Sequence, residues 1–204
     1  VENLNQWATW FIETTGVQGF RLDAVKHIDS FFMKNFIQQI TDKYGEDFYV
    51  FGEFWNGDEQ SNNDYLASID YQFDLVDVAL HHNLFRASQE GENFDLTTIF
   101  NGSLVANHPE NAVTFVDNHD TQRGQALEST VKPAAYALIL LREVGLPCVF
   151  YGDYYGISGD FAQQSFQAEL DQLLRIRKDL AYGEQRDYFD DPNCIAWTRS
   201  GTEE

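Results

Sequence analysis

Three short apolar runs in this chain each end abruptly at a carboxylate. They are GFRLD, VFGE and TFVDNHD, and their last residues are Asp23, Glu53 and Asp120. Apolar runs of this length are typical of strands buried in a parallel sheet. Because segments of helical length separate them, we expect a (β/α) arrangement that brings the three acids to one edge of a parallel sheet, where barrels of this class carry their chemistry.

The rest of the chain continues this alternation. Strands are expected at 16–22, 48–53, 71–75, 112–116 and 146–151. Helical segments are expected at 30–43, capped by Asp29 or Ser30, and at 76–86, 95–100, 134–143 and 164–178. After Gly183, two short strands at 186–189 and 194–198 have no helix between them, so we expect them to be antiparallel and to begin a second, all-β domain.

Five strands with helices fit either an open doubly wound sheet or part of a barrel. None of the expected strands is followed by a glycine-rich phosphate-binding loop, so the sequence does not support a nucleotide-binding protein. Acids at several strand ends favour part of a barrel.

Composition narrows the classes of partner. The formal net charge is −20, which argues against nucleic acid and against an anionic membrane surface and suits a neutral substrate. No apolar stretch reaches transmembrane length. The two cysteines are Cys148, which we expect to be buried in a strand, and Cys194, and they show no metal-binding Cys/His spacing.

Two of the acids suit complementary chemical roles. Arg21 and Asp23 lie on the same face of their strand, so Arg21 is expected to pair with Asp23 and hold it as a carboxylate, the form a nucleophile needs. Glu53 lies among aromatic residues, and an apolar setting raises the pKa of a carboxyl group, as a general acid requires. A carboxylate and a carboxylic acid together indicate a glycosidase. Asp120 follows Asn118 and His119, whose side chains can hydrogen-bond to sugar hydroxyls.

Each motif alone has a simpler interpretation. An Arg-x-Asp on a strand is commonly a structural ion pair, a Glu at a strand end is commonly a cap or loop residue, and Asn-His-Asp is a plausible turn. The three motifs together, in order on successive strands, favour a catalytic site.

The motifs resemble those of a known family. GFRLDAVKH, FGEFW and FVDNHDT resemble the segments that carry the three catalytic acids of the α-amylase family of glycoside hydrolases. VFYGDYYG resembles the end of that family's eighth barrel strand. Finer details, such as QRGQALES and AYGEQRDYFD, resemble the liquefying-type bacterial members.

The resemblance implies a retaining enzyme that cleaves internal α-1,4 bonds of starch or glycogen. Asp23 would be the nucleophile, Glu53 the proton donor and then the base, and Asp120 the acid that binds and distorts the sugar in the reacting subsite. The residues that resemble substrate contacts are Arg21, Lys26, His27, Trp55 and His119. The main-chain carbonyl of His27 also resembles a ligand of the family's structural calcium ion, Ca²⁺.

The resemblance also implies which part of the fold is present. Residues 1–183 would form strands four to eight of a (β/α)8 TIM barrel with their helices, and residues 184–204 would begin the C-terminal β-sandwich domain. The family's first motif and the small domain that supplies most calcium ligands are absent from the sequence, so we expect a fragment that is inactive alone. The turn at 190–193 lacks the histidine that a further calcium site would use.

Two rival interpretations remain beside an α-amylase that is monomeric when complete. One is a related α-glucan transglycosylase or α-glucosidase. The other is a non-catalytic carbohydrate-binding or assembly relative, which the presence of all three acids disfavours.

Overall fold

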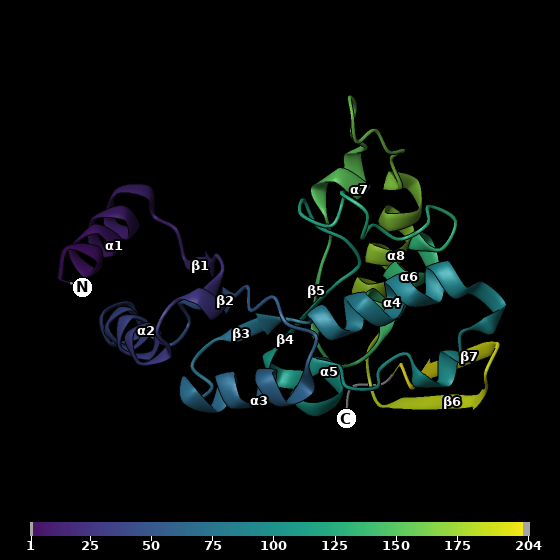
Figure 1. Cartoon of the computed structure of the whole chain (residues 1–204), viewed down its shortest axis with the longest axis horizontal. Helices are drawn as coiled ribbons and strands as arrows, with labels where there is room; N and C mark the ends of the chain where they lie inside the picture. Colours follow the sequence, from purple (N-terminus) through teal and green to yellow (C-terminus); the bar gives the residue numbers. More distant parts are fainter. Residues whose placement is uncertain (1, 202–204) are drawn as a thin grey trace. The chain divides into compact units, whose positions relative to one another are not determined.

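The computed structural model describes residues 2–201 as two compact units. The first unit ends at Val76 and the second begins at Asp77. Figure 1 labels the elements along the chain. Among the described residues, no helix is both long enough and apolar enough to span a bilayer.

The first unit alternates helices with three parallel strands. Its elements are α1 (Glu2–Thr15), β1 (Gly19–Leu22), the 3-10 turn η1 (Val25–His27), α2 (Ser30–Tyr44), β2 (Tyr49–Gly52), α3 (Glu59–Ser68) and β3 (Asp74–Val76). Strand β2 lies between β1 and β3 and is parallel to both. The helix α1 was not expected, and β1 begins three residues later than the sequence pattern indicates.

Helix α2 shows how the local sequence specifies an element. The Asp29 carboxylate accepts a hydrogen bond from the Phe32 N–H at 2.8 Å, which satisfies a donor that the first turn leaves free. The helix buries residues at helical spacing. It ends at Tyr44, and Gly45 caps its C-terminus with φ 97°. The buried residues are Met33, Phe36, Ile37 and Ile40. Of the two caps that the sequence pattern allows, the structure uses Asp29.

The second unit combines parallel strands, helices and a hairpin. Its first elements are α4 (Val78–Glu90), the 3-10 turns η2 (Gly91–Asn93) and η3 (Leu96–Thr98), α5 (Leu104–Asn107), η4 (Pro109–Asn111) and β4 (Ala112–Phe115). They are followed by α6 (Lys132–Leu141), β5 (Leu146–Cys148), α7 (Tyr151–Tyr155), α8 (Gln167–Asp179), β6 (Gln185–Asp191) and β7 (Cys194–Arg199). Strands β4 and β5 are parallel, and β6 and β7 form the expected antiparallel pair.

A buried carboxylate joins two helices of the second unit. Asp77 is fully buried, and it accepts the backbone N–H groups of Leu80, Leu104 and Val105 at 2.8–3.0 Å. It therefore caps the start of α4 and of α5 together. Burial raises the pKa of Asp77, although the three N–H donors act in the opposite direction.

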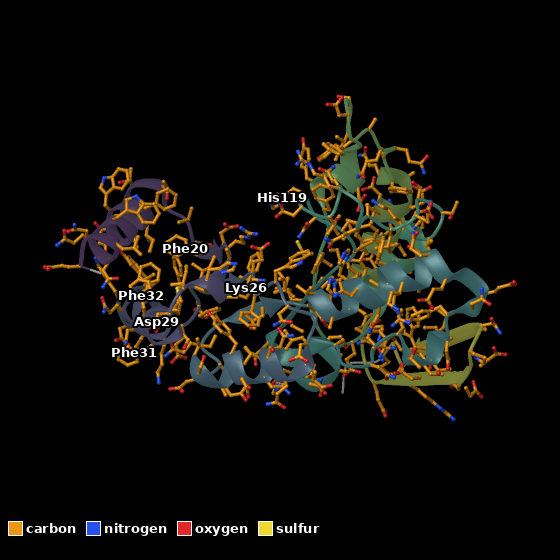
Figure 2. The ribbon with its side chains drawn as sticks, in the orientation of Figure 1. Phe20, Lys26, Asp29, Phe31, Phe32 and His119 are labelled. Atoms are coloured by element: carbon orange, nitrogen blue, oxygen red, sulfur yellow. The ribbon has the colours of Figure 1, made fainter. Side chains whose placement is uncertain are left out.

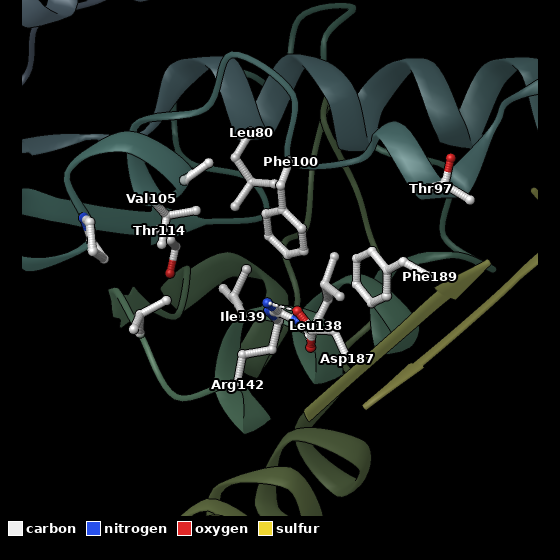
Figure 3. Close-up of a pocket in the computed structure, with 13 residues that line it drawn as sticks. Leu80, Thr97, Phe100, Val105, Thr114, Leu138, Ile139, Arg142, Asp187 and Phe189 are labelled. Carbon is white, nitrogen blue, oxygen red and sulfur yellow. Dashed lines mark hydrogen bonds and ion pairs between the residues drawn. The ribbon is translucent and has the colours of Figure 1, made fainter. Parts of the chain in front are cut away.

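The hairpin is attached to α6 through an arginine. The Arg142 guanidinium donates two hydrogen bonds to the Asp187 carboxylate, at 2.7 and 2.9 Å, and lies 4.5 Å from the centre of the Phe100 ring. Beside this contact lies a cavity of about 380 Å³ that Phe100, Phe189 and Thr114 help to line (Figure 3). None of the predicted site residues lines this cavity.

Further expectations about local structure are wrong, and the strand expected at 146–151 ends at Cys148. Cys148 is exposed rather than buried. It belongs to a strand of only three residues, two of which are exposed, so its apolar neighbours in sequence do not enclose it. The segment 95–100 forms only the short 3-10 turn η3 instead of a longer helix, with the Asp95 carboxylate accepting the Thr97 N–H at its start.

Candidate active site

Asp23 and Glu53 follow neighbouring strands at the same edge of the first unit's sheet. The register pairs Leu22 of β1 with Gly52 of β2, so each acid is the next residue along its own strand. Backbone hydrogen bonds continue beyond the strands, from Glu53 N to Leu22 O at 2.8 Å and from Val25 N to Glu53 O at 3.0 Å. The sheet therefore fixes the main chain at both acids, as the sequence pattern predicts for parallel strands.

Arg21 contacts both carboxylates. Its guanidinium forms an ion pair with Asp23, and its Nη2 lies 3.2 Å from Glu53 Oε1. The other oxygen of Glu53 accepts the Ala24 N–H at 3.0 Å. The sequence predicted the pairing with Asp23, which is confirmed, but it gave no sign of the contact with Glu53.

The two acids differ strongly in exposure. The Asp23 side chain is 75% exposed, whereas that of Glu53 is 10% exposed. The chain is closely packed at Gly52, the residue before Glu53. A Cβ atom on Gly52 would come within 2.8 Å of the Phe73 ring and within 3.2 Å of the Val25 methyl groups. Glycine at position 52 thus lets the chain approach closely next to the buried acid.

The turn after Asp23 is tight. Ala24 has φ 47° and ψ 41°, in the left-handed region that non-glycine residues rarely adopt. It leads into η1, in which Val25 is fully buried while Lys26 and His27 are exposed. The strained residue lies directly between Asp23 and the predicted substrate contacts.

Two residues that were predicted to contact the substrate, Lys26 and Trp55, are hydrogen-bonded to each other in the first unit. The Lys26 ammonium donates to the Trp55 carbonyl at 2.9 Å, which ties the turn after β1 to the segment after β2. Trp55 is half-buried, and its neighbour Phe54 stacks on Tyr65 with ring centres 4.4 Å apart. Figure 2 labels Lys26 in the first unit and His119 in the second.

Asp120 lies in the second unit, on the segment that follows β4. Its side chain is 59% exposed, and its carboxylate is 3.1 Å from His119 Nε2. The Asn118 side-chain oxygen accepts the backbone N–H groups of Asp120 at 2.9 Å and Thr121 at 3.1 Å, which sets the turn.

Below this turn is a buried charged cluster that the sequence analysis missed. Asp117 is 2% exposed, and its oxygens accept the Thr121 hydroxyl, the Leu127 N–H and the Lys132 ammonium at 3.2, 3.1 and 2.8 Å. Burial raises the pKa of Asp117, and Lys132 opposes that rise. The sequence feature that could have indicated the cluster is Lys132, a charged residue at the start of the otherwise apolar helix KPAAYALILL.

His81 borders the same cluster as a neutral side chain at neutral pH. Burial lowers its pKa to about 4. Its Nδ1 lies 2.7 Å from the Val116 carbonyl and 3.9 Å from Asp117. The imidazole thus donates to the carbonyl, and the longer contact with Asp117 is not an ion pair at neutral pH.

The described residues show no cluster of metal-binding side chains. Residues 2–201 contain no group of three or more His, Cys, Asp or Glu side chains that could hold a metal ion. Calcium takes six to eight oxygen ligands, so the single carbonyl of His27 is not enough.

Comparison with known proteins places the chain in a family. Residues 1–202 match the family model described as alpha amylase, catalytic domain. The chain belongs to this family. It is 45% identical over 205 residues to the glucan 1,4-alpha-maltohexaosidase of Bacillus sp. (strain 707), covering 98% of this chain and 39% of that protein. It is 43% identical over 208 residues to the alpha-amylase of Geobacillus stearothermophilus, covering all of this chain and 38% of that protein.

The likeness to α-amylases extends to the fold. The crystal structure of an Anoxybacillus alpha-amylase matches with a TM-score of 0.73 at 24% sequence identity, covering 100% of this chain and 49% of that one. The chain thus spans about two-fifths of the length of the curated α-amylase relatives it matches.

Proposed function

We propose that this chain carries the catalytic acids of a retaining α-amylase that cleaves internal α-1,4-glucosidic bonds of starch or glycogen. The observation that carries the proposal is the acid pair of the first unit. Asp23 and Glu53 follow adjacent parallel strands in register, and Arg21 contacts both carboxylates. A pair of carboxyl groups on one edge is the machinery that glycoside hydrolysis needs.

The roles follow from chemistry and exposure. Glu53 protonates the leaving glycosidic oxygen while the exposed carboxylate of Asp23 attacks the anomeric carbon to form a glycosyl-enzyme. Glu53, now a carboxylate, takes a proton from water, which attacks the same carbon and releases the sugar with its configuration retained. This mechanism requires the two carboxyl groups to lie about 5–5.5 Å apart.

The remaining predicted residues are proposed to bind the glucan. Asp120 binds and distorts the sugar at the reacting subsite, with His119 beside it. Arg21, Lys26 and His27 on the turn after β1, and Trp55 after β2, complete the set. The exposure of Lys26 and His27 and the Lys26–Trp55 hydrogen bond support a polar, substrate-facing surface there.

The finer architecture is also proposed. Residues 1–183 correspond to strands four to eight of a (β/α)8 barrel with their helices, and residues 184–204 correspond to the start of a β-sandwich. Calcium binds in the complete enzyme through the His27 carbonyl together with ligands outside these residues, and no catalytic step depends on it. The partner is a neutral α-glucan, for which the net charge of −20 is suitable, and the complete enzyme acts as a monomer.

Product analysis tests the activity. The complete natural polypeptide that carries residues 1–204, called the complete polypeptide below, is incubated with maltoheptaose, and early products are separated. We expect short oligosaccharides from internal cuts, with the α-anomer formed first. Release of glucose alone would support an α-glucosidase instead, and products longer than the substrate would support a transglycosylase.

A further inference from the structure

Lys132 is a buried charge that the proposed chemistry does not use directly. It stands at the start of α6 and is 2% exposed. Its ammonium contacts Asp117, which follows β4, and Asp153, which lies in α7 after β5. Burying an ammonium group costs free energy unless the group is paired, so the folded protein keeps Lys132 in contact with both carboxylates.

The second carboxylate of the cluster is fully hydrogen-bonded. Asp153 is completely buried, and it accepts the Tyr136 hydroxyl at 2.6 Å and the Gln163 side-chain amide at 2.8 Å in addition to Lys132. Tyr136 and Lys132 are four residues apart on α6 and therefore lie on one helix face. Asp153 thus gives Lys132 a second buried carboxylate partner besides Asp117.

Asp117 connects Lys132 by hydrogen bonds to the turn that carries Asp120. The Thr121 hydroxyl donates towards both Asp117, at 3.2 Å, and the Asn118 carbonyl, at 3.1 Å, and its oxygen accepts the Asn118 N–H at 3.1 Å. The Asn118 side chain in turn accepts the Asp120 N–H at 2.9 Å. Asp117 also accepts the Leu127 N–H, so it holds both ends of the segment between them.

We propose that Lys132 is a positioning residue that orients the Asp120 carboxylate through Asp117 and Thr121. The inference rests on the proposed role of Asp120 in binding the sugar at the reacting subsite. A carboxylate that must meet a sugar in a distorted geometry loses much of its effect when displaced by about 1 Å. Without Lys132, Asp117 would be a buried carboxylate lacking its cation, and the turn above it would relax.

A double-mutant cycle separates positioning from simple stability. In the complete polypeptide we substitute Lys132→Met, Asp120→Asn and both, and we measure kcat and KM on an aryl maltooligoside whose good leaving group keeps residual rates measurable. Lys132→Met is expected to lower kcat by about 30- to 100-fold, with a smaller change in KM. Added to Asp120→Asn, it should lower kcat by no more than about threefold, because the two residues act as one unit.

Controls keep the result interpretable. Lys178→Met makes the same substitution at an exposed lysine of α8 and should leave kcat unchanged. Lys132→Arg retains the charge and should recover part of the loss. If Lys132→Met fails to fold, Thr121→Val replaces it, since this change removes the linking hydroxyl without leaving a buried charge unpaired, and we expect about a tenfold loss in kcat.

The outcomes distinguish the positioning role of Lys132 from the proposed role of Asp120. A folded Lys132→Met or Thr121→Val protein with kcat within threefold of the parent overturns the positioning role. So does a full multiplicative loss when Lys132→Met is added to Asp120→Asn. An Asp120→Asn protein with unchanged kcat instead overturns the proposed role of Asp120 itself.

Discussion

The two units hold their acids in different ways. In the first unit, Arg21 touches the carboxylates of Asp23 and Glu53 directly, with a side chain 34% exposed. In the second unit, the cation is Lys132, which is 2% exposed and contacts Asp117 below the turn rather than Asp120 upon it. Arg21 contacts both acids of the first unit themselves, whereas Lys132 reaches Asp120 only through Asp117 and Thr121. Substitutions in the first unit should therefore affect the chemical steps more strongly.

The largest loss should come from the acid pair. Asp23→Asn removes the nucleophile and Glu53→Gln removes the transferable proton, while both substitutions keep the side-chain shape. Each should lower kcat on starch in the complete polypeptide by at least about 10³-fold without changing the melting temperature appreciably. Activity within tenfold of the parent for either variant would contradict the assigned role.

Arg21 should come next. Its planar guanidinium reaches two carboxylates at once, and the single ammonium of a lysine cannot reproduce that geometry. Arg21→Lys is expected to lower kcat by about 10- to 100-fold, measured at saturating starch. Arg186→Lys on the exposed β6 is the matched control and should change nothing. Equal activity of the two variants would show that the bridging contact has no part in the reaction.

Gly52→Ala tests the packing beneath Glu53. The added Cβ would meet the Phe73 ring at 2.8 Å, so the substitution should cost about 1–3 kcal/mol in unfolding free energy and lower kcat by displacing the acid. A second substitution, Phe73→Leu, makes space for the methyl group and should restore part of both losses. Denaturant unfolding and initial rates give the two readouts. No change in either for Gly52→Ala would mean that the close approach is unimportant.

The smallest effect on kcat at neutral pH should come from His81, which lies beside the buried cluster and acts on stability at low pH. Its pKa is about 4 in the folded protein, against 6.5 for an exposed histidine, so the fold disfavours the protonated form. Stability linked to His81 is therefore present above pH 6.5 and is lost as the pH falls from 6.5 towards 4. Between pH 7 and pH 4.5 this contribution amounts to about 2–3 kcal/mol.

His81→Gln removes this titration and keeps a hydrogen-bond donor. The loss of unfolding free energy between pH 7 and pH 4.5 should be smaller in the variant than in the parent by that amount. Denaturant unfolding at the two pH values measures it, and the groups common to both proteins cancel in the difference. Identical pH dependence would mean that His81 does not enter the fold as a neutral side chain.

Much of the local structure could be read from the sequence because its causes are local. The Asp29 cap, the helix that follows it and the acids at the ends of β1 and β2 depend on residues a few positions apart. The contact between Arg21 and Glu53 and the meeting of Lys132 with Asp117 join residues far apart in the chain. Such contacts depend on register and helix packing, which a single sequence does not reveal. The catalytic roles remain predictions.

The most direct test of the account is to trap the covalent intermediate. The Glu53→Gln form of the complete polypeptide is mixed with an α-maltosyl fluoride, whose leaving group needs no proton donor, and is then digested and examined by mass spectrometry. Because the base that activates water is missing, the glycosyl-enzyme should accumulate, with one maltosyl group on Asp23. A label on Asp120, or inversion of configuration with no label at all, would contradict the account.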